Sequence, residues 1–164
     1  MIAVLMGVSG CGKTTVGKIL SRMTGWRMFD ADDFHPAQNI EKMRSGIPLT
    51  DEDRWPWLDS LNTLLREWGE HENVLLACSA LKQSYRDRLA RDCRDVRWIL
   101  LSGDFDLILS RLANRRGHYM PASLLQSQFE TLEEPVGAIV IDIADDPETI
   151  ARRIADVLGA TQPR

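Results

Sequence analysis

The sequence predicts a three-layer α/β domain whose centre is a five-stranded parallel sheet. Short, almost continuously apolar runs alternate with segments of helical spacing along the whole chain, and such runs are typical of parallel strands buried on both faces. A glycine-rich turn at residues 7–14 directly follows the first apolar run. With 164 residues, of which 44% are hydrophobic and 27% charged, the chain is expected to form a single domain over residues 1–164.

The first half of the chain is expected to contain two strands and three helices. Gly25 suits the end of the first helix, and the turn around Pro48 separates the other two. The second strand runs directly into a group of acidic residues. The expected elements are strands over 2–7 and 26–29 and helices over 13–23, 36–45 and 55–70.

The second half repeats the alternation. Pro147 suits the first turn of the last helix, and Leu124, Leu125 and Phe129 form the apolar face of a further short helix. The other expected elements are strands over 74–78, 96–101 and 138–143 and helices over 82–92, 104–114 and 147–158. Carboxyl ends of parallel strands meet at one edge of a sheet, so the segments that follow the strands should converge on one site.

The glycine-rich turn is a phosphate-binding loop. Gly7, Gly12, Lys13 and Thr14 satisfy G-x-x-x-x-G-K-[ST] after a strand and before a helix. Backbone N–H groups and the helix dipole attract an anion there. Lys13 is expected to reach the β- and γ-phosphates, and the Thr14 hydroxyl to bind Mg²⁺. The fold class is therefore a P-loop NTP-binding domain. The expected nucleotide contacts are Gly7, Ser9, Gly10, Cys11, Gly12, Lys13, Thr14 and Thr15.

Two carboxylates after the second strand suit phosphoryl transfer to an alcohol. Asp30 and Asp32 could divide two roles, one holding the metal and the other accepting the proton of the hydroxyl. Ser79 stands where the third strand might carry a metal-binding aspartate, which favours Asp30 for the metal and leaves Asp32 as the base. The alternative is a solvated acidic turn in which Asp33 or His35 caps the following helix.

Several blocks of the sequence together resemble the gluconokinases. The most distinctive is Asp-Ala-Asp-Asp-Phe-His-Pro at 30–36. The blocks lie at 6–10, 12–13, 30–36, 48–54, 56–58, 78–82, 85–87, 103–106, 117–120 and 127–133. The resemblance implies ATP-dependent phosphorylation of D-gluconate at the 6-hydroxyl by direct in-line transfer. It also implies a shikimate-kinase-like fold, usually as a homodimer.

Gluconate carries a carboxylate, so its pocket needs a cation. Arg54 and Arg86 are candidates because a guanidinium can bind a carboxylate through two parallel hydrogen bonds, and Lys82 is a third. Arg54 could instead pair with a nearby aspartate, and Lys82 with Arg86 could form a solvated basic face. His35 could donate to a substrate hydroxyl or merely cap a helix.

Residues 111–134 are expected to form a helical lid over the nucleotide. Arg111 is placed to pack against adenine, and Arg115 to stabilise the transferring phosphoryl group. His118 and Gln128 are expected to be lid and substrate contacts. The alternative is an exposed basic helix end.

Composition excludes several other classes. The net charge is −4, from 20 basic and 24 acidic residues, so no nucleic-acid partner is expected. No apolar stretch reaches the length of a membrane span. Three scattered cysteines without metal-ligand spacing favour the reducing cytoplasm. The remaining alternatives are a kinase of another small polyol, sugar acid or shikimate, and a regulatory protein that binds ATP without turnover.

Cys11 stands where such loops commonly carry Ser. The position contributes mainly its backbone N–H, so phosphate binding should not suffer. A thiol beside Lys13 and a helix N-terminus is expected to react with alkylating agents, with protection by ATP. An inert, packed thiol is the alternative.

Overall fold

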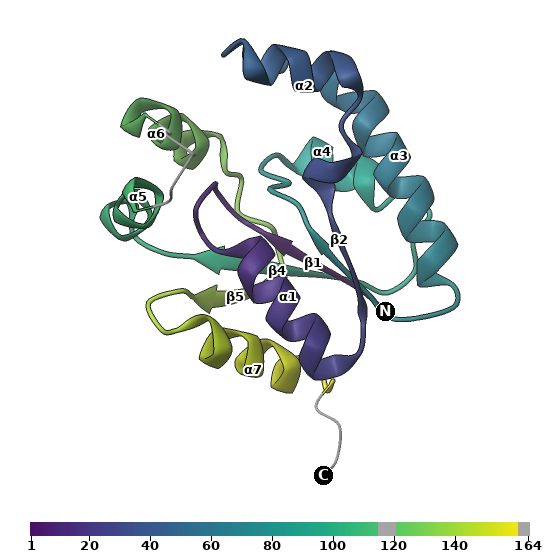
Figure 1. The fold of residues 1–164 in the computed structure, drawn as a ribbon. Helices are drawn as coiled ribbons and strands as arrows, with labels where there is room; N and C mark the ends of the chain where they lie inside the picture. Colours follow the sequence, from purple (N-terminus) through teal and green to yellow (C-terminus); the bar gives the residue numbers. More distant parts are fainter. Residues whose placement is uncertain (115–120, 161–164) are drawn as a thin grey trace.

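The computed structural model describes residues 1–114 and 121–160, and it contains the expected parallel sheet (Figure 1). The strand order is β2-β3-β1-β4-β5, and every neighbouring pair is parallel. The strands are β1 (Ile2–Met6), β2 (Arg27–Asp30), β3 (Val74–Ala77), β4 (Val96–Ser102) and β5 (Ile139–Asp142). In the sheet β1 lies between β3 and β4, so the carboxyl end of β1 lies between the carboxyl ends of these two strands.

Helices cover both faces of the sheet and make the predicted three layers (Figure 1). One face packs against α1 (Lys13–Thr24) and α7 (Pro147–Val157), and the other against α3 (Asp51–Gly69) and α4 (Gln83–Leu89). The short helix η1 (Ala31–Phe34), α2 (Ala37–Arg44), α5 (Phe105–Ala113) and α6 (Ala122–Thr131) lie toward the carboxyl edge of the sheet. None of the helices in the described part of the chain is long and apolar enough to cross a membrane.

The structure corrects two details of the sequence reading. β1 and β3 are buried at every residue, but the edge strands β2 and β5 are only partly buried, because each has a neighbour on one side only. Helix α3 begins at Asp51, four residues before the expected start. Thr50 and Asp53 form a reciprocal capping box that starts the helix there.

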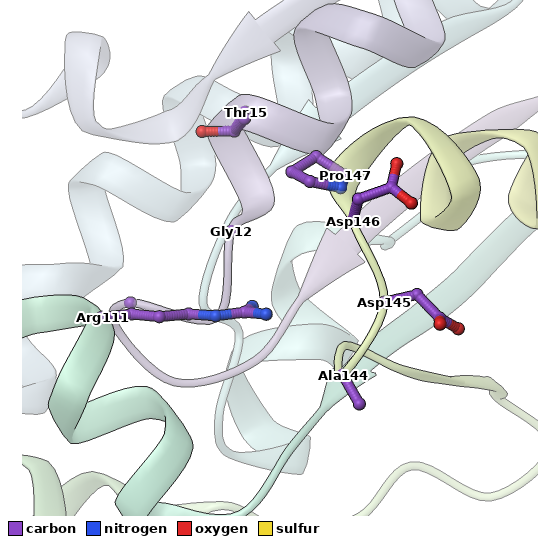
Figure 2. A pocket seen from close by; sticks show the side chains of 8 residues that line it. Gly12, Thr15, Arg111, Ala144, Asp145, Asp146 and Pro147 are labelled. Carbon is purple, nitrogen blue, oxygen red and sulfur yellow. The ribbon is translucent and has the colours of Figure 1, made fainter.

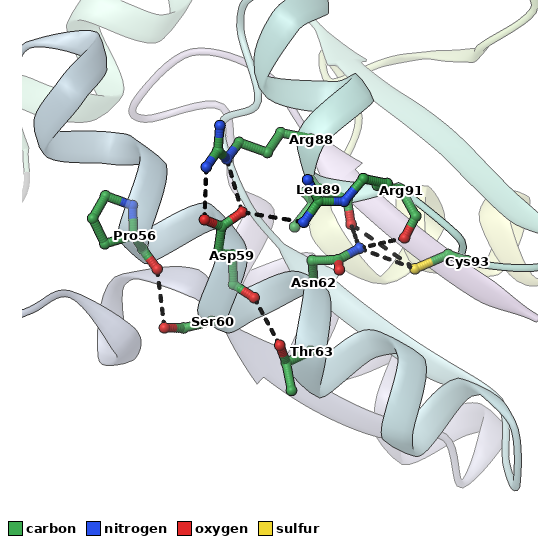
Figure 3. A network of polar contacts seen from close by, with 9 residues as sticks. All are labelled: Pro56, Asp59, Ser60, Asn62, Thr63, Arg88, Leu89, Arg91 and Cys93. Carbon is green, nitrogen blue, oxygen red and sulfur yellow. Dashed lines mark hydrogen bonds and ion pairs between the residues drawn. The ribbon is translucent and has the colours of Figure 1, made fainter.

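Asn62 joins α3 to the end of α4 (Figure 3). The side chain is buried, and its Nδ2 donates to the carbonyl oxygens of Leu89 at 2.9 Å and Arg91 at 2.7 Å. Beside it, Arg88 donates to both carboxylate oxygens of Asp59, at 2.8 and 2.7 Å. These contacts hold α4, and with it the loop that precedes α4, against α3.

Asn62→Ala is expected to lower the free energy of unfolding by about 3 kcal/mol, because it leaves two carbonyl groups of the α4 end without their buried donor. Thr63→Ala is the matched control. Thr63 is exposed, and its hydroxyl bonds only within its own helix, so its change should stay within about 0.5 kcal/mol. Urea unfolding of both variants measures the difference. Equal losses of stability would contradict the role of Asn62 in joining α3 to the end of α4.

Candidate active site

The phosphate-binding loop lies between β1 and α1, as predicted. Gly7 and Gly10 have φ of 138° and 83°, which side chains rarely adopt. A Cβ on Gly10 would also come within 2.6 Å of Leu112 on α5. Lys13 Nζ donates to the carbonyl oxygens of Gly7 and Val8, both at 3.0 Å. The ammonium group is therefore held against the loop that would surround a phosphate.

Thr14 and Asp30 meet beside this loop. Thr14 Oγ1 donates to Asp30 Oδ2 at 2.6 Å, and the other oxygen of Asp30 accepts the backbone N–H of Asp32 at 3.1 Å. A hydroxyl and a carboxylate are ligands that suit Mg²⁺, which usually keeps water and phosphate oxygens as its other ligands. No group of three or more His, Cys, Asp or Glu side chains suited to a metal occurs in the described residues. The pair thus fits an ion that arrives with the nucleotide.

Asp32 lies two residues further along, on η1. Its side chain is 88% exposed, and it stands at the carboxyl edge that carries the phosphate loop. Desolvation by the surrounding protein and the neighbouring Asp30 carboxylate raise the pKa of Asp32. A carboxylate so placed can accept a proton from an alcohol held at the same edge. Beside it, the buried His35 stacks on Trp57 with ring centroids 4.2 Å apart.

Acidification is expected to destabilise the fold partly through His35. Burial, opposed by the Asp32 carboxylate, lowers the pKa of His35 below its ordinary value of 6.5. The folded state therefore binds fewer protons at this site than the unfolded state. The resulting stability is present above pH 6.5 and is lost as pH falls through the lowered pKa. Thermal unfolding midpoints should fall on acidification, and fall less in His35→Gln. An unchanged pH dependence in the variant would contradict this assignment.

Among the three candidate cations for the substrate carboxylate, all within the described part of the chain, Arg54 has a buried donor that no acceptor satisfies. The two aspartates that might have paired with it have other partners. Asp51 accepts from the Tyr85 hydroxyl and Lys82, and Asp53 accepts from Lys42 at 2.7 Å. The guanidinium lies 5.5 Å from the centre of the Tyr85 ring, and its buried Nε has no hydrogen-bond partner in the described part of the chain. Such an unpartnered donor is suited to an anionic ligand.

Lys82 is close to this group but is already paired. Its Nζ lies 3.2 Å from Asp51 Oδ1, and the side chain is 34% exposed. Hydrogen bonds from Tyr85 and Lys82 lower the pKa of Asp51, and the bond to Asp51 raises the pKa of Lys82. Lys82 therefore stays charged, and its Nζ lies 5.4 Å from the centre of the same Tyr85 ring that Arg54 approaches.

Arg86 has a structural role in place of the expected substrate contact. The residue is 1% exposed, and its Nη1 donates to the carbonyl oxygens of Ala80 at 2.8 Å and Leu81 at 3.1 Å. Nε and Nη2 both donate to Gln83. Ala80 has φ of 45°, a strained value for alanine. Arg86 thus holds the loop between β3 and α4 in its conformation, and its burial also contradicts the alternative of a solvated face shared with Lys82.

Gln128, expected to contact substrate, bonds instead to the phosphate loop. Its Oε1 accepts the Ser9 N–H at 2.7 Å, and its Nε2 donates to Ser9 Oγ at 3.0 Å. The two bonds tie α6 to the loop. Arg115 and His118 lie outside the described residues, so the expected lid over 111–134 is described only for its flanks, the end of α5 and α6.

A cavity of about 420 Å³ opens beside the phosphate loop (Figure 2). Arg111 reaches across it from α5, and its Nη2 donates to the Ile143 carbonyl oxygen at 2.6 Å. The cavity brings together Thr15 and Arg111, both predicted for the nucleotide. It is lined by Gly10, Gly12, Thr15, Arg111, Ala144, Asp145, Asp146 and Pro147. The segment after β5 was expected at this edge of the sheet, and its turn at 144–147 lines the cavity.

Cys11 is buried, with 1% exposure, in the core beneath the loop, which favours the packed alternative over the reactive thiol. Iodoacetamide should therefore modify the partly exposed Cys93 first in the folded chain. Burial also raises the pKa of Cys78 to about 12, so Cys78 should stay unmodified until urea unfolds the chain. Mass spectrometry of labelled peptides tests this order. Rapid labelling of Cys11 with loss of activity would restore the reactive-thiol hypothesis.

Comparison with known proteins agrees with this geometry. The family described as an AAA domain matches residues 4–123. The chain is 47% identical to the thermosensitive gluconokinase of Escherichia coli (strain K12), over 80% of this chain and 71% of that protein. A gluconokinase structure from Sinorhizobium meliloti 1021 has a TM-score of 0.84 at 41% identity, covering 96% of this chain and 94% of that one. The unliganded structure of a sugar kinase from Janibacter sp. HTCC2649 has a TM-score of 0.88 at 44% identity, covering 97% of this chain and 94% of that one.

By its fold the chain is a P-loop kinase. Shikimate kinase from Aquifex aeolicus, which shares 16% identity over 97% of this chain and 96% of its own, has a TM-score of 0.59, a likeness of fold alone. Within this class the chain belongs to the gluconokinase family, as identities above 40% over most of its length to both the bacterial enzyme and the solved gluconokinase establish. The resemblance seen in the sequence is thus confirmed.

Proposed function

We propose that this protein transfers the γ-phosphoryl group of ATP to the 6-hydroxyl of D-gluconate, directly and in line. The single observation that carries the proposal is the buried, unpartnered guanidinium Nε of Arg54, in a chain that also carries a complete phosphate-binding loop. The carboxylate of a sugar acid would satisfy this donor. The names of the relatives, gluconokinases from bacteria and a plant, support the same substrate.

Each residue of the nucleotide site has a proposed task. The loop and Lys13 hold the phosphates, while Arg111 and the turn at 144–147 surround the base. Thr14 and Asp30 would hold Mg²⁺, which neutralises phosphate charge when it binds with ATP. Asp32 orients the 6-hydroxyl and accepts its proton, and Arg115 stabilises the moving phosphoryl group.

The acceptor pocket is proposed to lie between η1, α3 and the loop before α4. Arg54 binds the gluconate carboxylate, and Lys82 with its partner Asp51 offers a donor and an acceptor to the hydroxyl groups. Arg86 and Gln128 shape the site from behind rather than contacting substrate. We further propose that residues 1–164 act as one kinase domain, as a homodimer in the cytoplasm, and sedimentation analysis tests the dimer.

A coupled assay of ADP release tests the proposed reaction. The panel contains D-gluconate, its epimers, glycerate and shikimate, each with Mg·ATP. Saturable turnover on D-gluconate, with 6-phosphogluconate as product, is the expected result. Turnover on a different acid alone would require a new account of the Arg54 pocket. If no alcohol in the panel were phosphorylated while ATP still bound, a regulatory protein would be favoured.

A further inference from the structure

His35 is a buried side chain held between two helices and the acidic turn. Its side chain is 4% exposed and its ring is nearly parallel to that of Trp57, at an interplanar angle of 14°. Trp57 in turn donates its Nε1–H to the Ala31 carbonyl oxygen of η1 at 2.8 Å. The imidazole therefore has a fixed plane, and one residue of α3 holds both the ring and the turn that carries Asp32.

Asn39 on α2 determines which imidazole nitrogen carries the proton. Asn39 is fully buried, and its Nδ2 donates to the Asp53 carbonyl oxygen at 2.9 Å. A carbonyl only accepts, so the amide nitrogen must face it. The same nitrogen lies 3.5 Å from His35 Nδ1, and its second hydrogen makes Nδ1 the acceptor. The neutral ring then carries its proton on Nε2.

The protonated nitrogen faces the proposed base. His35 Nε2 lies 3.9 Å from Asp32 Oδ1. Asp32 is exposed, so a small rotation of its side chain is enough to bring the carboxylate within hydrogen-bonding distance of Nε2. The other charged group near the ring is the Arg54 guanidinium, which disfavours a charged imidazole. His35 is therefore a neutral imidazole whose Nε2–H is a hydrogen-bond donor of fixed direction.

We propose that His35 is a positioning residue, whose Nε2–H orients the Asp32 carboxylate toward the acceptor hydroxyl, with Asn39 and Trp57 fixing the donor. The inference rests on the proposed kinase function, and it replaces a direct contact between His35 and substrate. An exposed carboxylate without such a donor would sample several rotamers, few of them aligned with the hydroxyl. Misplacement of a reacting group by about 1 Å can cost about 100-fold in rate.

The test is a double-mutant cycle on the full chain with ATP and D-gluconate. His35→Asn keeps an amide near the Nδ1 position but loses the donor toward Asp32, and should lower kcat about 10- to 100-fold with little change in KM for gluconate. His35→Gln can reach the Nε2 position and should recover much of the loss. In the Asp32→Asn background, His35→Asn should cost almost nothing further.

Other outcomes overturn the inference. A raised KM with unchanged kcat would indicate direct substrate binding, and losses that multiply in the double variant would show that His35 acts independently of Asp32. An inactive wild-type chain would instead contradict the proposed function itself. Because His35→Asn could unfold, nitrogen-15 NMR of the wild-type imidazole, assigned by its loss in His35→Gln, provides a second measurement. A neutral ring protonated on Nδ1 would refute the proposal whatever the variants do.

Discussion

Asp32→Asn is expected to lower kcat by about 10²- to 10⁴-fold, the range for loss of a general base, while ATP binding is kept. The amide has nearly the shape of the carboxylate but cannot accept the proton of the 6-hydroxyl. Within residues 1–114 and 121–160 the Asp32 side chain makes no hydrogen bond that the fold depends on, and it is 88% exposed. The defect should therefore appear in turnover and leave stability intact. Coupled kinetics and nucleotide titration measure the two effects separately.

Two neighbouring aspartates are controls for this substitution. Asp33→Asn changes an exposed carboxylate of the same turn and should leave kcat within a few-fold of wild type. Asp30→Asn removes the partner of Thr14, so its loss should depend on Mg²⁺ concentration, whereas the loss in Asp32→Asn should not. Near-normal turnover of Asp32→Asn would refute its assignment as the base. If the loss of turnover in Asp32→Asn depended on Mg²⁺ concentration, Asp32 would be the metal ligand and Asp30 the base.

Arg54→Met is expected to lower kcat/KM for D-gluconate by about 100- to 1,000-fold, mainly through KM. Hydrogen bonds to charged groups contribute about 1.5–3 kcal/mol each, and the loss of two bonds near the lower end, about 3–4 kcal/mol, corresponds to this range. Methionine keeps much of the apolar length of the side chain beside Tyr85. Arg97→Met is the matched control, because Arg97 is paired with Asp95 near the amino end of β4, at the end of the strand opposite to the carboxyl edge. Its KM for gluconate should stay near that of wild type.

A neutral polyol makes this test specific for the carboxylate. D-Glucitol presents the same chain of hydroxyl groups without the charge, so wild type and Arg54→Met should phosphorylate it with the same low kcat/KM. A similar loss on glucitol and gluconate would mean that Arg54 acts on the fold or on a hydroxyl. The prediction for the carboxylate would then be wrong.

Local patterns in the chain were enough for the sheet and the nucleotide loop. The G-x-x-x-x-G-K-[ST] spacing dictates backbone shape within eight neighbouring residues, and the structure contains that loop where expected. Thr14 and Asp30 were both expected at the metal site, but their direct contact of 2.6 Å depends on the sheet, in which β3 separates β1 from β2. The start of α3 was predicted four residues late, although Thr50 and Asp53 carry a capping signal.

The sequence by itself determined the fold class, the phosphate loop and the family, because these depend on contiguous motifs and on the period of apolar residues. Only the tertiary structure decided how the three candidate cations are used. Arg86 binds carbonyl oxygens of its own loop, Lys82 pairs with Asp51, and Arg54 keeps a buried donor unpaired. The three side chains have similar chemistry, and their roles depend on which acceptors the folded chain brings within about 3 Å. That choice is made by residues distant in the sequence, so no local pattern could reveal it.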